Sequence, residues 1–318
     1  MPRHAIKRQP WSPEEENRLR EMLALKRYSF NQLAPFFPGR NGNSLRKHAL
    51  VHMGLSNEGF ILHKHSYNQR FFETPNPVNC YVAGYYAADG HIADNPTTRI
   101  LTMTLSNIEW HQLETFKRLF EYTGPVVDTS YDYAPNMCAL RLYGAHQITA
   151  DLERNFGLTP RKTHRLPAPN LTDPHLQLCY LAGLLDGDGC VHISKYGFIV
   201  ISYVSASRAI VEWVKGFTNS LNLLSVRKGR KGEILTTSGI AAYTYKIVGA
   251  KAIDLIKRIQ CLKKEGLPIL DRKWDNERLN SYIRDFEARH GITIPIIASS
   301  TSVSSCASSA LSSSVQPV

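Results

Sequence analysis

The sequence predicts an α+β protein in which one αββαββα unit occurs twice, after a small all-helical module at the N-terminus. The main observation is that two nine-residue segments nearly repeat each other, residues 82–90 (VAGYYAADG) and residues 181–189 (LAGLLDGDG). Each segment ends in Asp-Gly, and the aspartates Asp89 and Asp188 stand 188 − 89 = 99 residues apart. Helical and strand-like patterns follow both segments in the same order. We therefore expect two related halves that meet at a pseudo-two-fold axis.

Composition and charge limit the classes of function. The 318 residues are 43% hydrophobic and 20% charged, which is typical of a globular protein. The net charge of +11 favours a polyanionic partner such as nucleic acid. We find no stretch that would span a membrane, and the basic N-terminus lacks the apolar core of a signal peptide. We expect no membrane partner.

The cysteines indicate the redox compartment. The chain has six, and none of them forms a C-x-x-C pair. This pattern argues against a structural zinc site and against a disulfide framework. We expect an intracellular protein in a reducing compartment, and the sequence leaves open whether this is an organelle, the cytoplasm or the nucleus.

Residues 1–56 predict a module of three short helices. Ser12 is expected to cap the first helix, and Glu15 completes a capping box three residues later. A second helix is expected over residues 30–36, and a third begins at an Asn43 cap. The module resembles a helix-turn-helix of the Myb/SANT-like or homeodomain-like type.

In such folds the last helix enters the major groove of DNA. Its exposed face is expected to carry Ser44, Arg46, Lys47 and His48, and we take Arg46 and Lys47 as candidate DNA contacts. The alternative is a small bundle that only packs on the main domain. Residues 57–76 are expected to form a linker, which either follows a phosphate backbone or is solvated.

The two repeats are expected at residues 77–172 and 173–290, followed by a serine-rich tail at residues 291–318 that predicts disorder. The first repeat should contain a helix, two strands, a helix, two strands and a helix at residues 82–88, 91–93, 99–106, 108–122, 126–133, 137–143 and 145–156. The second should contain the same seven elements at residues 175–187, 190–194, 198–204, 207–219, 223–228, 242–248 and 250–261.

Small residues inside both repeated segments predict close contact between their helices. Gly84 and Gly183 lie within the predicted helices, where glycine costs roughly 0.5–1 kcal/mol relative to alanine. A close approach of the two helix backbones would offset that cost. The alternative is two ordinary core helices that are rich in small residues, but the Asp-Gly at the end of both argues against it.

The two segments resemble the signature of the LAGLIDADG homing endonucleases. The second copy is the closer match to the family's namesake string. The departures are Leu185 and Gly187 in the second copy, and Val82, Tyr85, Tyr86 and Ala87 in the first. The resemblance covers residues 75–290 approximately. It implies a monomer with two pseudo-symmetric LAGLIDADG repeats, whose saddle-shaped antiparallel sheets lie in the major groove of DNA.

The resemblance also implies a metal site. Asp89 and Asp188 would bind Mg²⁺, or another divalent cation such as Mn²⁺, because carboxylate and carbonyl oxygens are hard ligands. The backbone carbonyls of Ala88 and Gly187 would assist. In the family such metals activate water for attack on a phosphodiester. Asp186 has no carboxylate counterpart in the first copy, so we expect it to have a structural role.

Each repeat ends in an Arg-Lys pair, and the resemblance implies that its lysine is an active-site residue. Lys162 and Lys273 are therefore candidates to stabilise charge in the transition state. The alternative is that both are surface phosphate contacts or solvated charges. For the residue that positions the attacking water, Thr104 and Tyr203 are candidates by their place in the second strand of each copy.

DNA contacts are expected on the polar faces of the strands. Leu101, Met103 and Leu105 alternate with polar residues, which predicts one buried face and one polar face, and the resemblance implies that the polar face contacts DNA. A cationic loop at residues 227–231 would contact phosphates, or else be solvated. The candidate DNA contacts are Thr102, Thr104, Arg141, Tyr143, Arg227, Lys228, Arg230 and Lys231.

These patterns together predict a monomeric, metal-dependent DNA endonuclease. It would bind a long, asymmetric double-stranded DNA site and hydrolyse one phosphodiester in each strand. The chain lacks an intein splicing signature, so we interpret it as free-standing or intron-encoded. Two alternatives remain open, an intron RNA maturase that binds intron RNA and a DNA-binding regulator that has lost cleavage.

Overall fold

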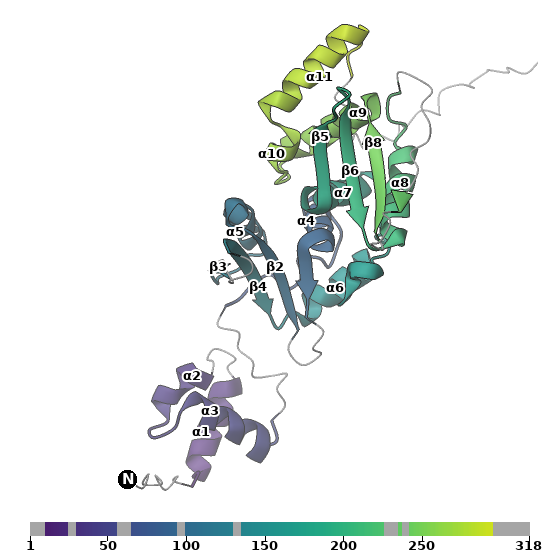
Figure 1. Cartoon of the computed structure of the whole chain (residues 1–318). Coiled ribbons are helices and arrows are strands. Elements are labelled where there is room, and N and C mark those ends of the chain that lie inside the picture. The colour runs from purple at the N-terminus through teal and green to yellow at the C-terminus, as the bar shows by residue number, and fades with distance from the viewer. Residues whose placement is uncertain are drawn as a thin grey trace, which may run out of the picture.

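The structure is a computed structural model of the chain, and it describes residues 10–24, 30–55, 65–93, 99–129, 135–225, 235–236 and 242–294. The described residues form a helical N-terminal bundle and a larger body with two sheets (Figure 1). The predicted cationic loop with Arg227, Lys228, Arg230 and Lys231 lies outside the described residues, and so does the predicted tail from residue 295 onward.

The N-terminal module consists of short helices around a small core of its own. Leu19 and Leu23, Leu33 and Leu45 from three of these helices meet in that core, and Phe37 and Ala49 complete it. The segments are α1 (Pro13–Ala24), α2 (Phe30–Leu33), η1 (Ala34–Phe36), α3 (Gly42–Lys47) and η2 (His48–His52), of which η2 continues α3 as a π-helical turn.

The observed N-terminal cap matches the predicted one at the first helix of this module and differs from it at the third. The backbone N–H of Ser12 donates to the Glu15 carboxylate at 3.1 Å, and the Glu15 N–H donates to Ser12 Oγ at 3.2 Å. The predicted capping box is therefore confirmed. The predicted Asn43 cap is wrong, because Asn41 has the extended backbone of a cap and its side chain accepts from Ser44 N at 2.9 Å.

The order αββαββα is confirmed in both repeats. The first contains α4 (Pro77–Asp89), β1 (Gly90–Ile92), β2 (Ile100–Ser106), η4 (Asn107–Glu109), α5 (Trp110–Leu119), β3 (Val127–Asp128), β4 (Met137–Tyr143), α6 (His146–Phe156) and η5 (Lys162–His164). The second contains α7 (Pro174–Asp188), β5 (Gly189–Ile193), β6 (Ile199–Ser205), α8 (Arg208–Ser220), β7 (Leu235–Thr236), β8 (Tyr243–Val248) and α9 (Ala250–Lys264), followed by α10 (Asp271–Trp274) and α11 (Glu277–His290).

Each repeat forms one antiparallel sheet of four strands, in the order β1-β2-β4-β3 or β5-β6-β8-β7. The strand predicted at residues 223–228 is wrong in its described part, since residues 223–225 are not in a strand. Asn222 has a left-handed backbone there, with φ 49. The Asp254 carboxylate then accepts from Leu224 N at 2.8 Å, which ties the chain to α9.

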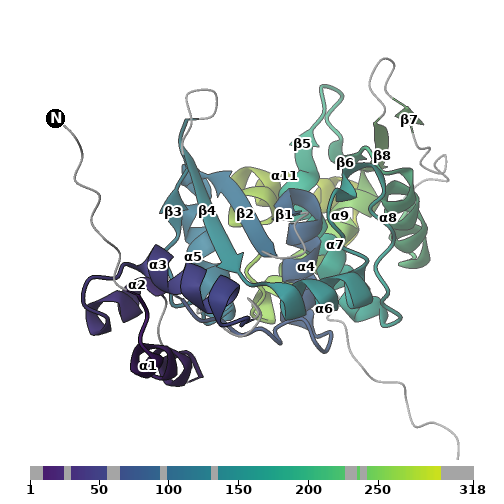
Figure 2. The same ribbon diagram turned by 90° about the horizontal axis from the view of Figure 1, so that it is seen from below.

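The two sheets flank the central helix pair α4 and α7, as both views show (Figures 1 and 2). Helix α5 packs against β2 and β4, while α8 and α9 pack against β6 and β8. One continuous hydrophobic core runs through both repeats. The inner residues of β2 that alternation predicted, Leu101, Met103 and Leu105, are buried in it.

Helices α4 and α7 approach so closely that only glycine fits at their crossing. A Cβ atom added to Gly84 would lie 2.0 Å from the carbonyl oxygen of Tyr180, and one added to Gly183 would lie 1.9 Å from that of Tyr81. Real Cβ atoms do not come that near to backbone atoms. The predicted close contact is confirmed, and its two halves are related by the pseudo-two-fold axis.

The described part of the predicted linker packs onto the first repeat. Phe72 is fully buried in the main core. Asn68 N donates to the carbonyl oxygen of Phe120 at 2.7 Å, and the Tyr67 hydroxyl donates to that of Tyr143 at 2.9 Å. From residue 65 onward the segment therefore belongs to the body of the protein. Within the described ranges, no helix has both the length and the apolar character needed to cross a membrane.

We predict that Gly84→Ala and Gly183→Ala each lower the free energy of unfolding by more than about 2 kcal/mol, because the methyl group would meet backbone that cannot turn away. Urea unfolding measures this. Gly216→Ala is the matched control, since Gly216 also lies within a helix but an added Cβ meets nothing within 4 Å. It should stabilise by roughly 0.5–1 kcal/mol. Equal effects at the three positions would contradict the tight crossing.

Candidate active site at the ends of the paired helices

The crossing of α4 and α7 brings their last residues, Asp89 and Asp188, to the same point. Both helices end at the aspartate, and the glycine that follows takes an extended conformation and starts a strand. The helix ends touch, because a Cβ atom on Gly187 would lie 2.3 Å from Ala88 Cβ and 3.0 Å from the Asp89 carboxylate. A small residue at position 187 therefore allows the two carboxylates to approach.

The two acids lie in an unfavourable environment for negative charge. Burial, then the neighbouring Asp188 carboxylate, raises the pKa of Asp89 to about 6. Burial also raises the pKa of Asp188. By surface area, however, both aspartates are exposed. The carboxylates thus lie at an open surface. The surrounding protein atoms and the neighbouring carboxylate nevertheless disfavour the ionised form of each acid.

Lys162 lies against the end of α4. Its ammonium donates to the carbonyl oxygens of Ala87 at 2.7 Å and Ala88 at 2.9 Å. These carbonyls belong to the last turn of the helix, which has no intrahelical donors for them. Burial lowers the pKa of Lys162, and the nearby Asp188 and Asp89 carboxylates oppose that shift.

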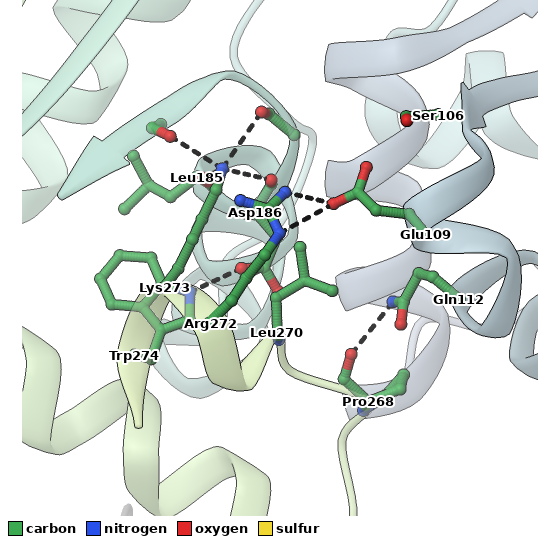
Figure 3. Close-up of polar contacts among 12 residues, drawn as sticks. Ser106, Glu109, Gln112, Leu185, Asp186, Pro268, Leu270, Arg272, Lys273 and Trp274 are labelled. Carbon is green, nitrogen blue, oxygen red and sulfur yellow. Dashed lines mark hydrogen bonds and ion pairs between the residues drawn. The ribbon is translucent and has the colours of Figure 1, made fainter. Parts of the chain in front are cut away.

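Lys273 does the same at the end of α7, with more partners. Its ammonium contacts the carbonyl oxygens of Leu185 at 3.0 Å, Gly187 at 3.2 Å and Gly189 at 2.7 Å, and also that of Asp186. Figure 3 shows it reaching this helix end from α10. Burial lowers its pKa as well, with the Asp186 carboxylate opposing. The alternative that the two lysines are solvated surface charges does not fit these contacts.

The oxygen atoms at this point suit a divalent cation. The described residues contain no cluster of three or more His, Cys, Asp or Glu side chains that could hold a metal. The available donors are therefore two carboxylates, Asp89 and Asp188, and the carbonyls of Ala88 and Gly187. A carbonyl oxygen has two lone pairs, so its bond to a lysine leaves one acceptor position. Such hard oxygen donors are those that Mg²⁺ prefers.

Asp186 does not face the other acids but lies in a buried network. Its side chain is 1% exposed. It accepts hydrogen bonds from the Tyr81 hydroxyl at 2.7 Å and from Leu270 N at 3.1 Å. It also accepts one from Trp274 Nε1 at 2.5 Å (Figure 3). Burial nevertheless raises its pKa to about 6. This position is the one expected of a structural residue.

The two candidates for positioning water are not equivalent. Gly90 pairs with Met103, whereas Gly189 pairs with Tyr203, so the strand register makes Tyr203 the counterpart of Met103 rather than of Thr104. Tyr203 is buried, and its pKa is raised by burial and then by the nearby Asp188. Thr104 is half-buried on the outer face of its sheet.

The outer face of the first sheet carries the predicted polar residues. Thr102 pairs with Arg141, and both are half-buried, while Tyr143 is 43% exposed. Thr102 also pairs with the exposed His91 of β1, so three polar side chains form one row across the sheet.

The second sheet has a matching row that sequence analysis missed. Cys190 pairs with Ser202, and Ser202 pairs with Lys246. Lys246 is exposed and occupies the position that Arg141 has in the first sheet. Alternation of Tyr245 and Ile247 with Lys246 was a signal that could have identified it.

In the N-terminal module, Arg46 and Lys47 are exposed on α3, as expected. His48 is not, which corrects the predicted exposed face. Its ring stacks on Trp11 at 3.8 Å between centroids and contacts the Glu16 carboxylate at 2.8 Å. The helix rotates His48 toward the core because Leu45 and Ala49 must both be buried.

Comparison with known families identifies two domains. Residues 8–53 match the Myb-like DNA-binding domain, and residues 175–256 match the LAGLIDADG-like domain. The chain is thus similar to a Myb-like DNA-binding domain in its N-terminal module and to a LAGLIDADG-like domain in its second repeat. The LAGLIDADG-like match covers the second repeat from α7 into α9, and the first repeat has the same order of elements and strands. A comparison with curated proteins finds no match.

Several solved structures are similar to the chain. One is the meganuclease I-SmaMI bound to uncleavable DNA, at 15% identity and TM-score 0.38, which covers 68% of this chain and 98% of that one. Another is the LAGLIDADG homing endonuclease I-LtrWI bound to target DNA, at 15% identity and TM-score 0.40, covering 69% and 91%. A third is the LAGLIDADG meganuclease I-AabMI bound to uncleaved DNA, at 14% identity and TM-score 0.37, covering 67% and 98%.

Proposed function

We propose that this protein is a site-specific homing endonuclease that binds a long, asymmetric double-stranded DNA target and hydrolyses one phosphodiester in each strand. The observation that carries the proposal is the pair of carboxylates, Asp89 and Asp188, at two touching helix ends with one lysine beside each. Two carboxylates whose ionised forms are disfavoured by their surroundings do not stabilise the fold, which points to a functional role. Because one chain carries both carboxylates and both lysines, it would act as a monomer on both strands.

The proposed cofactor is Mg²⁺ or another divalent cation, held by Asp89, Asp188 and the carbonyls of Ala88 and Gly187. When bound, such a cation supplies charge stabilisation for phosphate oxygens and makes water a better nucleophile at neutral pH. The side chains contribute in two ways. The carboxylates orient the reacting groups, and the Lys162 and Lys273 ammonium groups place positive charge where the phosphate becomes more negative.

DNA binding is proposed to use the outer faces of both sheets. The row His91, Thr102 and Arg141 would face one half of the target, and the row Cys190, Ser202 and Lys246 the other. Because the two rows differ in every position, their preferred bases should differ. This difference supports an asymmetric target. The net charge of +11 favours phosphate contacts along the whole site.

The Myb-like domain is proposed to lengthen the footprint through the exposed Arg46 and Lys47 of α3. We propose domain boundaries at residues 1–56 for this domain, 77–172 for the first repeat and 173–290 for the second. Residues 57–76 would join the two parts, and the portion from residue 65 onward packs onto the first repeat.

We predict that Asp188→Asn abolishes double-strand cleavage while DNA binding remains within about threefold of wild type, because the neutral amide lacks the negative charge with which a carboxylate attracts a divalent cation. The substrate is the chain's own insertion locus joined without the insertion, in Mg²⁺ or in EDTA. EDTA should abolish cleavage by the wild-type protein. Asp285→Asn, an exposed change on α11, is the control and should cleave at the wild-type rate.

Full activity of Asp188→Asn would contradict the proposed active site. Tight binding of the locus by wild-type protein without cleavage would instead favour a maturase or a regulator. A maturase would assist splicing of intron RNA even after loss of both Asp89 and Asp188, which a splicing assay with the double variant would reveal.

Deletion of residues 1–60 should shorten the footprint on the target and weaken binding, because the Arg46 and Lys47 contacts to DNA are lost. We expect at least about a tenfold loss of affinity at physiological salt. Footprinting and titration measure the two effects. The double variant Arg46→Ala with Lys47→Ala in the full chain is the matched control for misfolding. A footprint of unchanged length after the deletion would rule out the proposed role of the module.

Arg141→Ala and Lys246→Ala should each relax base preference in a different half of the target. A good base contact is worth about 1–3 kcal/mol, so discrimination should fall roughly tenfold at the affected positions. Selection of cleaved sites from a randomised library would show this. Lys215→Ala, on helix α8 beneath the second sheet, should change neither half. Loss of preference in the same half for both variants would refute the two-row arrangement.

A further inference from the structure

The two sides of the central helix pair α4 and α7, here called its flanks, carry different side chains, although the backbone is pseudo-symmetric. In the repeated segments, Asp186 of α7 corresponds to Ala87 of α4, and Tyr180 corresponds to Tyr81. One flank therefore has a buried carboxylate where the other has a methyl group.

On the flank with Asp186, one buried carboxylate holds both ends of a short helix. Leu270 N donates to Asp186 Oδ2 at 3.1 Å, and Trp274 Nε1 donates to Asp186 Oδ1 at 2.5 Å. These two residues stand immediately before and at the end of α10, which carries Arg272 and Lys273. The contacts of Asp186 therefore fix the segment from which Lys273 reaches the end of α7.

The first repeat holds the same segment from its other side. Gln112 Nε2 donates to the carbonyl oxygen of Pro268 at 3.0 Å. Arg272 forms an ion pair with Glu109, with one of its nitrogens, Nε, at 3.1 Å from the carboxylate (Figure 3). Residues 268–274 are thus bound to both repeats, and the neighbour of Lys273 in sequence is itself anchored.

On the opposite flank, Ala87 stands at the position of Asp186 and has no carboxylate to accept hydrogen bonds. The hydroxyl of Tyr180 is buried and has no hydrogen-bond partner among the described residues, whereas the Tyr81 hydroxyl donates to Asp186 at 2.7 Å. The Tyr180 ring instead stacks on Phe156, with centroids 6.0 Å apart and planes at 4°. This side of the helix pair is held by aromatic packing rather than by a carboxylate.

In each repeat a helix follows the second strand, and the residue that immediately precedes this helix also differs. It is Glu109 in the first repeat and Ser207 in the second. Ser207 Oγ donates to the carbonyl oxygen of Leu166 at 2.8 Å, so the segment after Lys162 receives a neutral hydrogen bond from the second repeat. Lys162 itself follows Arg161, whose backbone is left-handed with φ 57.

We propose that Asp186 is a positioning residue for Lys273 and not for Lys162, so that cleavage of the two DNA strands depends on different supports. The part of the proposal that concerns the two DNA strands rests on the endonuclease function proposed above. Asp186→Asn keeps the size of the side chain but turns one acceptor oxygen into a donor. That donor would face either Trp274 Nε1 or the Tyr81 and Leu270 donors, so α10 would lose one of its anchors.

The first test needs no cleavage. Reductive methylation of the metal-free full-length protein, followed by mass spectrometry, measures how fast each lysine reacts. In Asp186→Asn, Lys273 should be labelled at least about fivefold faster because its helix is released, while the rate at Lys162 stays unchanged. Asp151→Asn is the control, since Asp151 is a buried carboxylate on α6 that pairs with Arg154. It should alter neither rate.

The second test follows each strand of a supercoiled plasmid that contains the target. Asp186→Asn should slow one strand by about tenfold or more and leave nicked circles. The slowed strand should be the one slowed by Lys273→Ala, and Lys162→Ala should slow the other. Adding Asp186→Asn to Lys273→Ala should cause little further loss. Trp274→Phe, which replaces the indole with a smaller aromatic ring and removes the Nε1 donor, should show the same strand bias if Asp186→Asn does not fold.

Equal slowing of both strands, or faster labelling of both lysines, would overturn the proposal and leave Asp186 with a general structural role. If wild-type protein cuts neither strand while the labelling pattern holds, the endonuclease function fails and the positioning of Lys273 stands. If wild-type protein cuts both strands and Asp186→Asn matches it at both lysines and both strands, the positioning role fails and the endonuclease function stands.

Discussion

The backbone contact between α4 and α7 is the constraint on which the rest of the structure depends. Gly84 and Gly183 each face a carbonyl oxygen of the other helix at a distance that no Cβ atom could share. The contact fixes the crossing of the helices, and the crossing fixes where they end. It also sets the separation of the two sheets, because β1 and β5 begin directly after the helix ends.

The same constraint concentrates unfavourable charge at one point. Two helix C-termini carry partial negative charge from their unpaired carbonyls, and Asp89 and Asp188 add two carboxylates. Lys162 and Lys273 compensate by donating to those carbonyls. Burial and mutual repulsion still raise the pKa of Asp89 to about 6. A cluster of ionisable groups whose charged forms are disfavoured is characteristic of a functional site rather than of a stabilising one.

Pseudo-symmetry in this protein holds for the backbone and fails for the side chains. Both repeats have the same elements and the same strand order, so both sheets present one row of side chains at equivalent positions. The chemistry of the rows and of the two interface flanks differs. Asp186, Glu109 and Trp274 form polar contacts on one flank, whereas Tyr180 and Phe156 form aromatic contacts on the other. A single chain can vary the halves independently, which a symmetric dimer of identical subunits cannot.

The sequence by itself determined the features that depend on neighbours along the chain. The repeated segments fixed the two halves and the close helix crossing, since Gly84 and Gly183 stand in motifs that end alike. Alternation fixed the inner face of β2, and the Ser12–Glu15 pair fixed the start of α1, because both signals act within three residues.

Only the tertiary structure decided what depends on pairing between distant segments. Register, rather than spacing, makes Tyr203 the counterpart of Met103 and brings Lys246 level with Arg141. The contacts of Asp186 with Leu270 and Trp274 join residues more than eighty positions apart, so no local pattern records them. The cap at Asn41 was missed for a related reason. Asparagine is a good cap at either position, and only the folded backbone shows that Asn41 is extended and accepts from Ser44 N.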